Sequence, residues 1–551
     1  MTLKSPFPVR LMLAFALVAA AVVAAVPGPS AAEDASSPDA AWARRVCKAV
    51  PRDELQRTYN GYRFDRSGDI QFFAKPPDFV GSGLPHVGPW DYVQGVPMVW
   101  YGPGFIQAGR TLKRPVTLAD IAPTQAALLD FPFNAPDGRV MGEALLPEAD
   151  RPDPPKIIVT VIWDAGGTNV LNEWKRSWPN LRKLAAEGTQ YTNATVGLSP
   201  PSTAQAHATI GTGAFPNRHA LVAHHFRVGE TMTVPWEMGS RLLDLPTLSD
   251  LYDRANGNKP IIAGVGSVPI HLGMVSHGMT WGGGDKDIAI LTNVNNPKTV
   301  GAEGPEWSLP EPLQSDYSFP EFALNVPGYS QDKRMIDQMD GKADGKWREE
   351  SIAALAEGFE TPARIPWETT LVQELIKRER LGADATPDLL FVNYKVIDYV
   401  SHVWSMNSPY MDDSVRVQDE DLPRLVNALD SVVGKDEYVL LITADHGAMP
   451  DPKVTGAFVA SPGKIGNLIE DKFGEGTIML TQNTTAFLDV PLLESRDYTV
   501  ADVARYVETF TKGQTYLEGV KVDPKEADDR LFDAAFPSSL LADMPCVKTS
   551  E

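Results

Sequence analysis

The chain has 551 residues, with 50 lysines and arginines against 71 aspartates and glutamates, so its formal net charge is −21. This negative charge argues against a nucleic-acid backbone or an anionic membrane surface as the main partner, and we expect no binding of nucleic-acid duplexes. The length suits one large catalytic domain with insertions, or two or three ordinary domains.

The N-terminus predicts a secretory signal peptide. Lys4 and Arg10 precede an apolar run at 11–26, and small residues follow up to Ala32, so we expect residues 1–32 to be the signal peptide. The alternative is an uncleaved membrane anchor, but the run is short for a spanning helix. We therefore expect a secreted, periplasmic or extracellular protein with no membrane span after signal cleavage.

Short apolar runs alternate with helical patterns along the chain. The runs predict strands, in chain order, at IQFFA (from Ile70), VPMVWY (Val96), KIIVTVIW (Lys156), LLFVNYKV (Leu389) and EYVLLIT (Glu437). Helical patterns between them cover 117–129, 178–188, 247–256, 369–381 and 422–433. Nearly continuous Val, Ile and Leu runs are typical of strands covered on both faces, so we expect an α/β fold with a mostly parallel central sheet flanked by helices on both faces.

Two segments depart from this alternation. The acidic, proline-rich residues 146–155 are typical of an extended linker. Residues from about 257 to 365 contain a stretch rich in Gly, Pro, Asn and Trp, which suggests an insertion or a cap over a site.

Three of the predicted strands end close to an aspartate. Asp164 follows the third strand, Asp398 lies four residues before His402 after the fourth, and Asp445 directly precedes His446 after the fifth. Each motif alone has an ordinary explanation as a turn or a helix-surface ion pair. Together, three carboxylates with imidazoles suit Zn²⁺ and exceed what one tetrahedral ion needs, so we expect two metals.

A hydroxyl motif completes the chemistry. Ser202 and Thr203 precede the helical sequence AQAHATIGTG, where a hydroxyl is usually a simple N-cap. The same position offers free N–H groups and a positive dipole end to an oxyanion or a phosphate. The capping role is the expected one unless a base or a metal lies nearby.

With these motifs the chain resembles the alkaline phosphatase superfamily, in its nucleotide pyrophosphatase/phosphodiesterase and phosphate-irrepressible alkaline phosphatase branch. The resemblance implies an alkaline-phosphatase-like fold with two Zn²⁺ per chain and a small phosphate-ester substrate. Asp164, Thr203, Asp445 and His446 would surround one zinc, with Thr203 as the nucleophile that becomes phosphorylated. Asp398 and His402 would bind the second zinc.

The family supplies a third ligand to the second zinc, a histidine downstream of the Asp-His-Gly motif, but no histidine follows His446 here. Residues 47–145, including His86 in GLPHVGPWDYVQGVPMVWYGPG, resemble the family's usual C-terminal segment, whereas its usual start resembles the sequence from Lys156. We therefore predict a circular permutation in which 156–551 forms the rest of the same domain and His86 is the missing ligand.

The chain has only two cysteines, Cys47 and Cys546. In an oxidising compartment a disulfide between them is the simplest expectation. Such a bond would place the two ends of the chain side by side, where the permutation opens new termini.

Two departures from the family pattern bear on the substrate. His224 stands where the family often has an asparagine that holds a phosphoryl oxygen; the alternative is a surface histidine pair with His225. The stretch 266–284 offers His271 and His277, and we expect His271 to contact the substrate. It contains no lysine or arginine to bind a dianion, so the sequence favours diesters or pyrophosphates. We therefore expect a secreted phosphoric ester hydrolase of the phosphodiesterase or nucleotide pyrophosphatase type. The alternatives are an alkaline phosphomonoesterase and, from another class, a catalytically silent metal-binding or interaction module.

Overall fold

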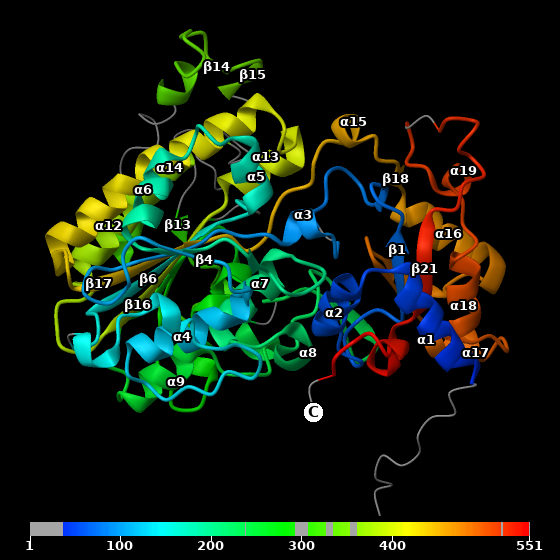
Figure 1. Ribbon diagram of the computed structural model, residues 1–551, viewed down its shortest axis with the longest axis horizontal. Helices are drawn as coiled ribbons and strands as arrows, with labels where there is room; N and C mark the ends of the chain where they lie inside the picture. Colours follow the sequence, from blue (N-terminus) through cyan, green and yellow to red (C-terminus); the bar gives the residue numbers. More distant parts are fainter. Residues whose placement is uncertain are drawn as a thin grey trace, which may run out of the picture.

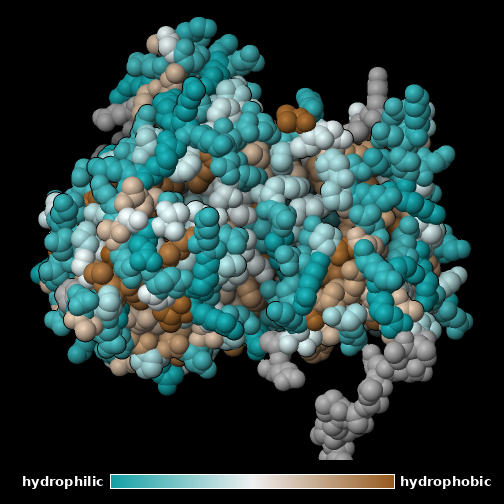
Figure 2. All heavy atoms as spheres, in the orientation of Figure 1, coloured by the Kyte–Doolittle hydropathy of each residue, from teal (hydrophilic) through white to brown (hydrophobic). Residues whose placement is uncertain are grey.

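The structure is a computed structural model that describes residues 37–549, except 87, 152, 237–238, 293–306, 327–333, 353–360 and 520–521. The predicted signal peptide, 1–32, lies outside the described residues. Among the helices of the described part, none combines the length and the apolar character needed to cross a bilayer. The face in Figure 2 is covered mostly by hydrophilic side chains, with apolar ones in small groups.

A nine-stranded mixed sheet forms the centre of the larger part of the molecule (Figure 1). Its strands, in spatial order, are β13 (Trp307–Ser308), β12 (Ile288–Thr292), β11 (Ile262–Val265), β16 (Asp388–Tyr394), β6 (Ile157–Trp163), β17 (Tyr438–Thr443), β3 (Met98–Tyr101), β7 (Thr189–Tyr191) and β4 (Arg110–Leu112). The strands from β12 to β17 run parallel to one another, and all residues of β6, β16 and β17 are buried. This agrees with their nearly continuous apolar sequences.

Helices cover both faces of this sheet and enclose two apolar cores. The helices α6 (Pro179–Glu187), α12 (Arg364–Arg378) and α14 (Pro409–Leu429) pack on one face, and α4 (Ile121–Leu128), α7 (Thr203–Thr212) and α9 (Leu248–Ala255) on the other (Figure 1). The predicted helices at 117–129, 178–188 and 247–256 therefore agree with the structure to within a few residues.

Two helices begin earlier than the sequence predicted. α12 begins five residues before 369, and α14 begins at Pro409, thirteen residues before 422. Pro423 explains the second error, because a proline is favoured in the first turn of a helix and costly inside one. Here Pro423 lies inside α14, and the N-terminus is set by Ser408, whose side chain accepts a hydrogen bond from the Met411 N–H.

The strand predicted at Val96 belongs to the central sheet, but β3 runs antiparallel to β17. The strand predicted at Ile70, β1 (Ile70–Ala74), lies in a different sheet. The four-stranded antiparallel sheet has the order β19 (Ile478–Thr481), β20 (Thr485–Leu488), β1 and β21 (Phe532–Pro537). An apolar run shows burial but neither direction nor partner, so the sequence could not assign them.

The four-stranded sheet is the centre of the smaller part of the molecule, at the right in Figure 1. Together with α1 (Pro38–Ala49), α16 (Pro462–Phe473) and α18 (Val500–Val507) it encloses an apolar core of its own. Segments from both ends of the chain build this part, since β1 lies between β20 and β21. Cys47 and Cys546 form a disulfide there, with their Cα atoms 5.9 Å apart.

The range from about 257 to 365 is divided between two positions. Its strands β11 and β12 are members of the central sheet. A small hairpin of β14 (Lys346–Trp347) and β15 (Glu350–Ser351) lies at the outer end of the molecule, at the top in Figure 1. Three stretches of this range, 293–306, 327–333 and 353–360, lie outside the described residues.

Candidate active site

Three buried aspartates meet where three adjacent strands end. Asp164 follows β6, Asp445 follows β17, and Asp398 lies in the first turn of α13 (Val396–Trp404), which follows β16. Because these strands are neighbours and parallel, their carboxyl ends lie at one edge of the sheet, where open α/β sheets bind ligands. The exposed fraction of each aspartate is at most 2 %.

The turns that carry these aspartates pack directly against each other. A Cβ atom on Gly167 would lie only 2.5 Å from the Cα atom of Gly447, so glycine is required at this contact. The backbone N–H of Ala165 donates to Asp445 Oδ1 at 3.0 Å, which joins the turn after β6 to the turn after β17. The glycines that follow both aspartates therefore allow the two motifs to share one site.

Thr203 begins α7 beside the first group of ligands. His446 Nε2 lies 3.2 Å from Asp445 Oδ2, 3.7 Å from Asp164 Oδ1 and 3.4 Å from Thr203 Oγ1. Ligands of a tetrahedral zinc at 2.0–2.2 Å lie about 3.3–3.6 Å apart, close to these distances. Asp445 Oδ2 is also buried without a hydrogen-bond partner, so these residues fit one zinc ion.

A second group of ligand atoms converges on Asp398. His86 Nε2 lies 3.3 Å and His402 Nε2 3.4 Å from Asp398 Oδ1, a buried oxygen without a hydrogen-bond partner. The other ring nitrogens face backbone carbonyls, His86 Nδ1 that of Pro201 at 3.3 Å and His402 Nδ1 that of Leu84 at 3.1 Å. This arrangement orients both rings and turns each Nε2 toward Asp398 Oδ1, so this group fits a second zinc.

Burial and the neighbouring His446 lower the pKa of His86 to about 4, so its ring is neutral. A neutral imidazole is the form that binds a metal. The structure thus brings His86, from an early loop of the chain, into contact with Asp398, more than three hundred residues later.

Lys395 is a member of this site that the sequence reasoning missed. It lies between β16 and α13, and its Nζ is 2.9 Å from Asp164 Oδ1, 2.7 Å from Asp398 Oδ2 and 3.2 Å from Thr203 Oγ1. Burial lowers the pKa of this amine, but Asp164 and Asp398 raise it more, and the net pKa stands above its ordinary value. The ammonium group therefore stays charged between the two groups of ligands. The signal in the sequence was a lysine at the end of a fully buried strand, three residues before Asp398.

A buried network behind the site holds Thr203 and Asp164. Asn393 Nδ2 donates to Asp164 Oδ2 and to His207 Nε2, both at 2.9 Å, and His207 Nδ1 donates to the Thr203 carbonyl at 2.8 Å. Neither Asn393 nor His207 was singled out from the sequence. His271, predicted to bind substrate, is 2 % exposed, and its Nε2 lies 3.5 Å from Asp164 Oδ2. His271 therefore contacts Asp164 on the buried side.

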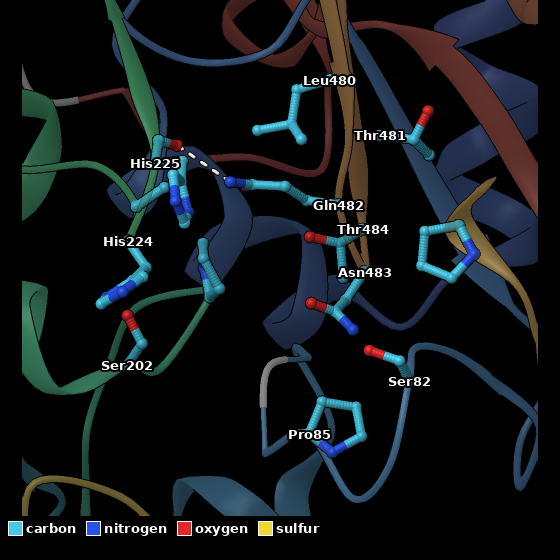
Figure 3. Close-up of a pocket in the computed structure, with 13 residues that line it drawn as sticks. Ser82, Pro85, Ser202, His224, His225, Leu480, Thr481, Gln482, Asn483 and Thr484 are labelled. Atoms are coloured by element: carbon cyan, nitrogen blue, oxygen red, sulfur yellow. Dashed lines mark hydrogen bonds between the residues drawn. The ribbon is translucent and has the colours of Figure 1, made fainter. Parts of the chain in front are cut away.

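His224 lies at a cavity of about 330 Å³ that is also lined by Ser202, the residue before Thr203. Figure 3 shows it beside Ser202 and His225, with Gln482, Asn483 and Thr484 of the turn between β19 and β20 across the cavity. The described lining residues are Ser82, Pro85, Pro200, Ser202, Ala223, His224, His225, Pro462, Leu480, Thr481, Gln482, Asn483 and Thr484. None of them is Asp, Glu, Lys or Arg, so the cavity wall is polar but carries no fixed charge. Ser202 donates its hydroxyl to Gln205 and does not cap α7.

Together, the fold and the site define an α/β protein with a buried carboxylate and imidazole centre, of the kind that holds metal ions, at the carboxyl edge of its sheet. Comparison with known proteins narrows this class. The family model of type I phosphodiesterase / nucleotide pyrophosphatase matches residues 158–539. Because this match covers more than half of the chain, the protein belongs to that family.

Individual relatives agree with this assignment. Alkaline phosphatase PafA from Elizabethkingia meningoseptica is 30 % identical over 188 residues, which cover 32 % of this chain and 34 % of the relative. Alkaline phosphatase PhoK from Sphingomonas sp. is 23 % identical over 325 residues, with 54 % and 56 % of the two chains covered. The chain thus spans between a third and three fifths of these relatives. The crystal structure of PafA matches with a TM-score of 0.51 at 19 % identity, over 64 % of this chain and 76 % of that one, which shows a shared fold.

Proposed function

We propose that the protein is a secreted, two-zinc phosphoric ester hydrolase that works through a phosphothreonine at Thr203. The observation that carries this proposal is the position of Thr203 Oγ1, 3.4 Å from His446 Nε2 and 3.2 Å from Lys395 Nζ, between two groups of residues that each fit a zinc ion. Localisation outside the cytoplasm, periplasmic or extracellular, rests on the predicted signal peptide.

The residues of the chain have distinct roles in this proposal. Zinc, when bound, polarises phosphoryl oxygens and lowers the pKa of a coordinated hydroxyl or water. Thr203 Oγ1 attacks phosphorus and the bond from phosphorus to the leaving-group oxygen breaks. The leaving group departs as an alcohol that takes up the proton lost by the Thr203 hydroxyl. Water then cleaves the phosphothreonine, which releases the phosphate product and restores the hydroxyl. Lys395 remains protonated and stabilises negative charge on Thr203 Oγ1.

The cavity beside Ser202 suits the leaving group. It opens next to the nucleophile, and its described wall contains amide and hydroxyl groups without charged side chains. Gln482 Nε2 donates to the His225 carbonyl at 3.0 Å and Asn483 Nδ2 to the Val80 carbonyl at 2.7 Å, which fixes both amides. We therefore propose that the leaving group is neutral. His224, exposed at the same cavity, would donate a hydrogen bond to a phosphoryl oxygen.

The position of Lys395 favours an alkaline phosphomonoesterase activity over a phosphodiesterase or nucleotide pyrophosphatase activity. The sequence leaned to diesters because residues 266–284 contain no lysine or arginine. Lys395 supplies a fixed cation from another segment, within 3.2 Å of the nucleophile. A monoester dianion gains more from a fixed cation than a diester monoanion does, so we propose monoesters as the preferred substrates.

Turnover of p-nitrophenyl phosphate and bis-p-nitrophenyl phosphate tests this function. We expect hydrolysis by the zinc-loaded wild type, faster on the monoester, and its loss in Thr203→Ala. Thr231→Ala, at an exposed hairpin strand, is the matched control and keeps wild-type turnover. Absence of Thr203-dependent turnover on both esters would support the catalytically silent alternative, and faster diester turnover would restore the phosphodiesterase reading.

We also propose that the chain is a circular permutant of its family. The family match begins at residue 158, in β6, while β1 and β3, from the earlier segment, pair with strands from the later one. The disulfide joins the two ends where the new termini lie. A chain that begins at 156 and carries residues 37–145 after residue 549 through a short linker should fold with the same activity. A chain of this order that stays unfolded would contradict the proposal.

A further inference from the structure

A second cluster of carboxylates lies apart from the candidate active site. Asp253 lies in the last turns of α9, and Asp285 and Asp287 lie in the segment that leads into β12. One oxygen atom from each of the three side chains lies within 4.8 Å of the other two. The cluster shares no residue with the groups around Thr203, so the proposed hydrolase function leaves it unexplained.

The negative charge of this cluster has no counterpart in the described part of the chain. Asp253 is 4 % exposed, and its buried Oδ1 accepts no hydrogen bond. Asp287 is 7 % exposed and accepts a hydrogen bond from the Ser276 hydroxyl. No lysine, arginine or histidine among the described residues forms an ion pair with the three carboxylates. Even Lys286, between two of them, directs its amine to the Gln314 carbonyl at 2.8 Å.

Burial without a counter-charge is costly for a carboxylate. Burial, together with Asp285 and Asp250, raises the pKa of Asp253 to about 7, and burial raises the pKa of Asp287 above its ordinary range. The neighbouring Asp250 needs no cation, because its carboxylate already has hydrogen-bond partners: the His277 ring and the His277 backbone N–H both lie 2.6 Å from it. The unpaired Asp253 Oδ1 is thus the feature that points to a bound cation.

We propose that Asp253, Asp285 and Asp287 bind a hard divalent cation of the calcium class. Calcium binds carboxylate oxygens at 2.3–2.6 Å, so two oxygens on one ion lie at most about 5 Å apart, which all three pairs satisfy. Asp253 and Asp287 form the buried floor of the site, and the exposed Asp285 leaves it open to solvent for entry of the ion. Water molecules would complete the coordination sphere on the exposed side.

Such an ion would join α9 to the segment that leads into β12. The stretch Gly282–Gly284 directly before Asp285 carries no side chains that could pack against the protein, and Gly283 adopts a φ of +93° that favours glycine. An ion that binds only the folded state stabilises that state in proportion to the logarithm of its concentration. We therefore expect calcium to raise the melting temperature of the protein without acting on the phosphoryl group.

Calorimetric titration of the zinc-loaded full chain with CaCl₂ tests the proposal. We expect one calcium per chain, with an affinity that falls at least about tenfold in Asp285→Asn, since the variant loses one charged ligand. Asp285 is exposed, so this change leaves the core intact. Asp471→Asn, at an exposed aspartate of α16, is the matched control and binds like wild type.

A thermal melt of the same proteins gives an independent reading. The melting temperature of wild type and Asp471→Asn should rise with calcium concentration, and that of Asp285→Asn should rise only at higher concentrations. No calcium binding to wild type, equal binding by Asp285→Asn, or an equal response to Mg²⁺ would overturn the proposal. Turnover by Thr203 is measured separately and does not enter either outcome.

Discussion

Replacement of Lys395 by methionine separates the two substrate readings most sharply. Methionine keeps the length of the side chain and removes the ammonium group, which lies 3.2 Å from Thr203 Oγ1 and between Asp164 and Asp398. A hydrogen bond to a charged group contributes about 1.5–3 kcal/mol, which corresponds to a factor of about 10 to 150. We expect kcat/KM for p-nitrophenyl phosphate to fall by this factor, and that for bis-p-nitrophenyl phosphate to fall several-fold less.

The assay compares the ratio of the two kcat/KM values in the zinc-loaded wild type, Lys395→Met and Lys395→Arg. The arginine variant keeps the positive charge and should retain a ratio closer to wild type. Zinc content, measured by mass spectrometry of the metal, should stay at two per chain in Lys395→Met, because the variant keeps every proposed ligand. Lys395 contacts Asp398 through Oδ2, whereas Oδ1 faces His86 and His402. Loss of the ammonium group also frees Asp164 Oδ1 for the first zinc. Equal falls on both esters, or no fall on the monoester, would refute the reasoning.

Three further results are expected. His86→Ala should lose one of two zincs and most turnover, because His86 Nε2 faces Asp398 Oδ1. The control is His225→Ala, which should keep both zincs because the His225 ring lies at the cavity. Unchanged zinc content in His86→Ala would refute the role of His86 as a ligand. Treatment with a chelator should abolish turnover and added Zn²⁺ should restore it, whereas turnover that survives complete metal removal would contradict a zinc mechanism. Cys47→Ser should lower the free energy of unfolding by about 6 kcal/mol in the chain-entropy account, since the disulfide closes a loop of about 500 residues. Denaturant unfolding measures this, and an unchanged midpoint would contradict it.

The sequence allowed the strands under the site to be predicted, because their apolar runs are long and nearly continuous. That is why Asp164, Asp398 and Asp445 could be grouped before the structure was known. The direction of β3 and the separate sheet of β1 could not be predicted, since both depend on which strands lie beside them. Pro423 misled the prediction of α14 because it has the appearance of a helix start.

Prediction of the site's side chains from the sequence was limited in the same way, because their roles depend on which residues the fold places beside them. His86 was identified through the resemblance to a family and the absence of a later histidine, and no local pattern marks it. Lys395 follows a buried strand, and its role depends on carboxylates from three distant segments, so periodicity gave no signal for it. Asp253 lies more than thirty residues before Asp285 and Asp287 in the sequence, and only the fold brings the three carboxylates together.

The central claim is that Thr203 forms a covalent bond to the phosphoryl group. Acid quenching of the zinc-loaded enzyme during turnover of p-nitrophenyl phosphate, followed by peptide mass spectrometry, tests it directly. The account predicts a peptide heavier by one phosphoryl group, with the modification on Thr203, and no such peptide from Thr203→Ala. Two results would contradict the account. The wild type could turn over substrate with no phosphorylated Thr203, even when phosphate release is slowed, or the phosphoryl group could be found on another residue.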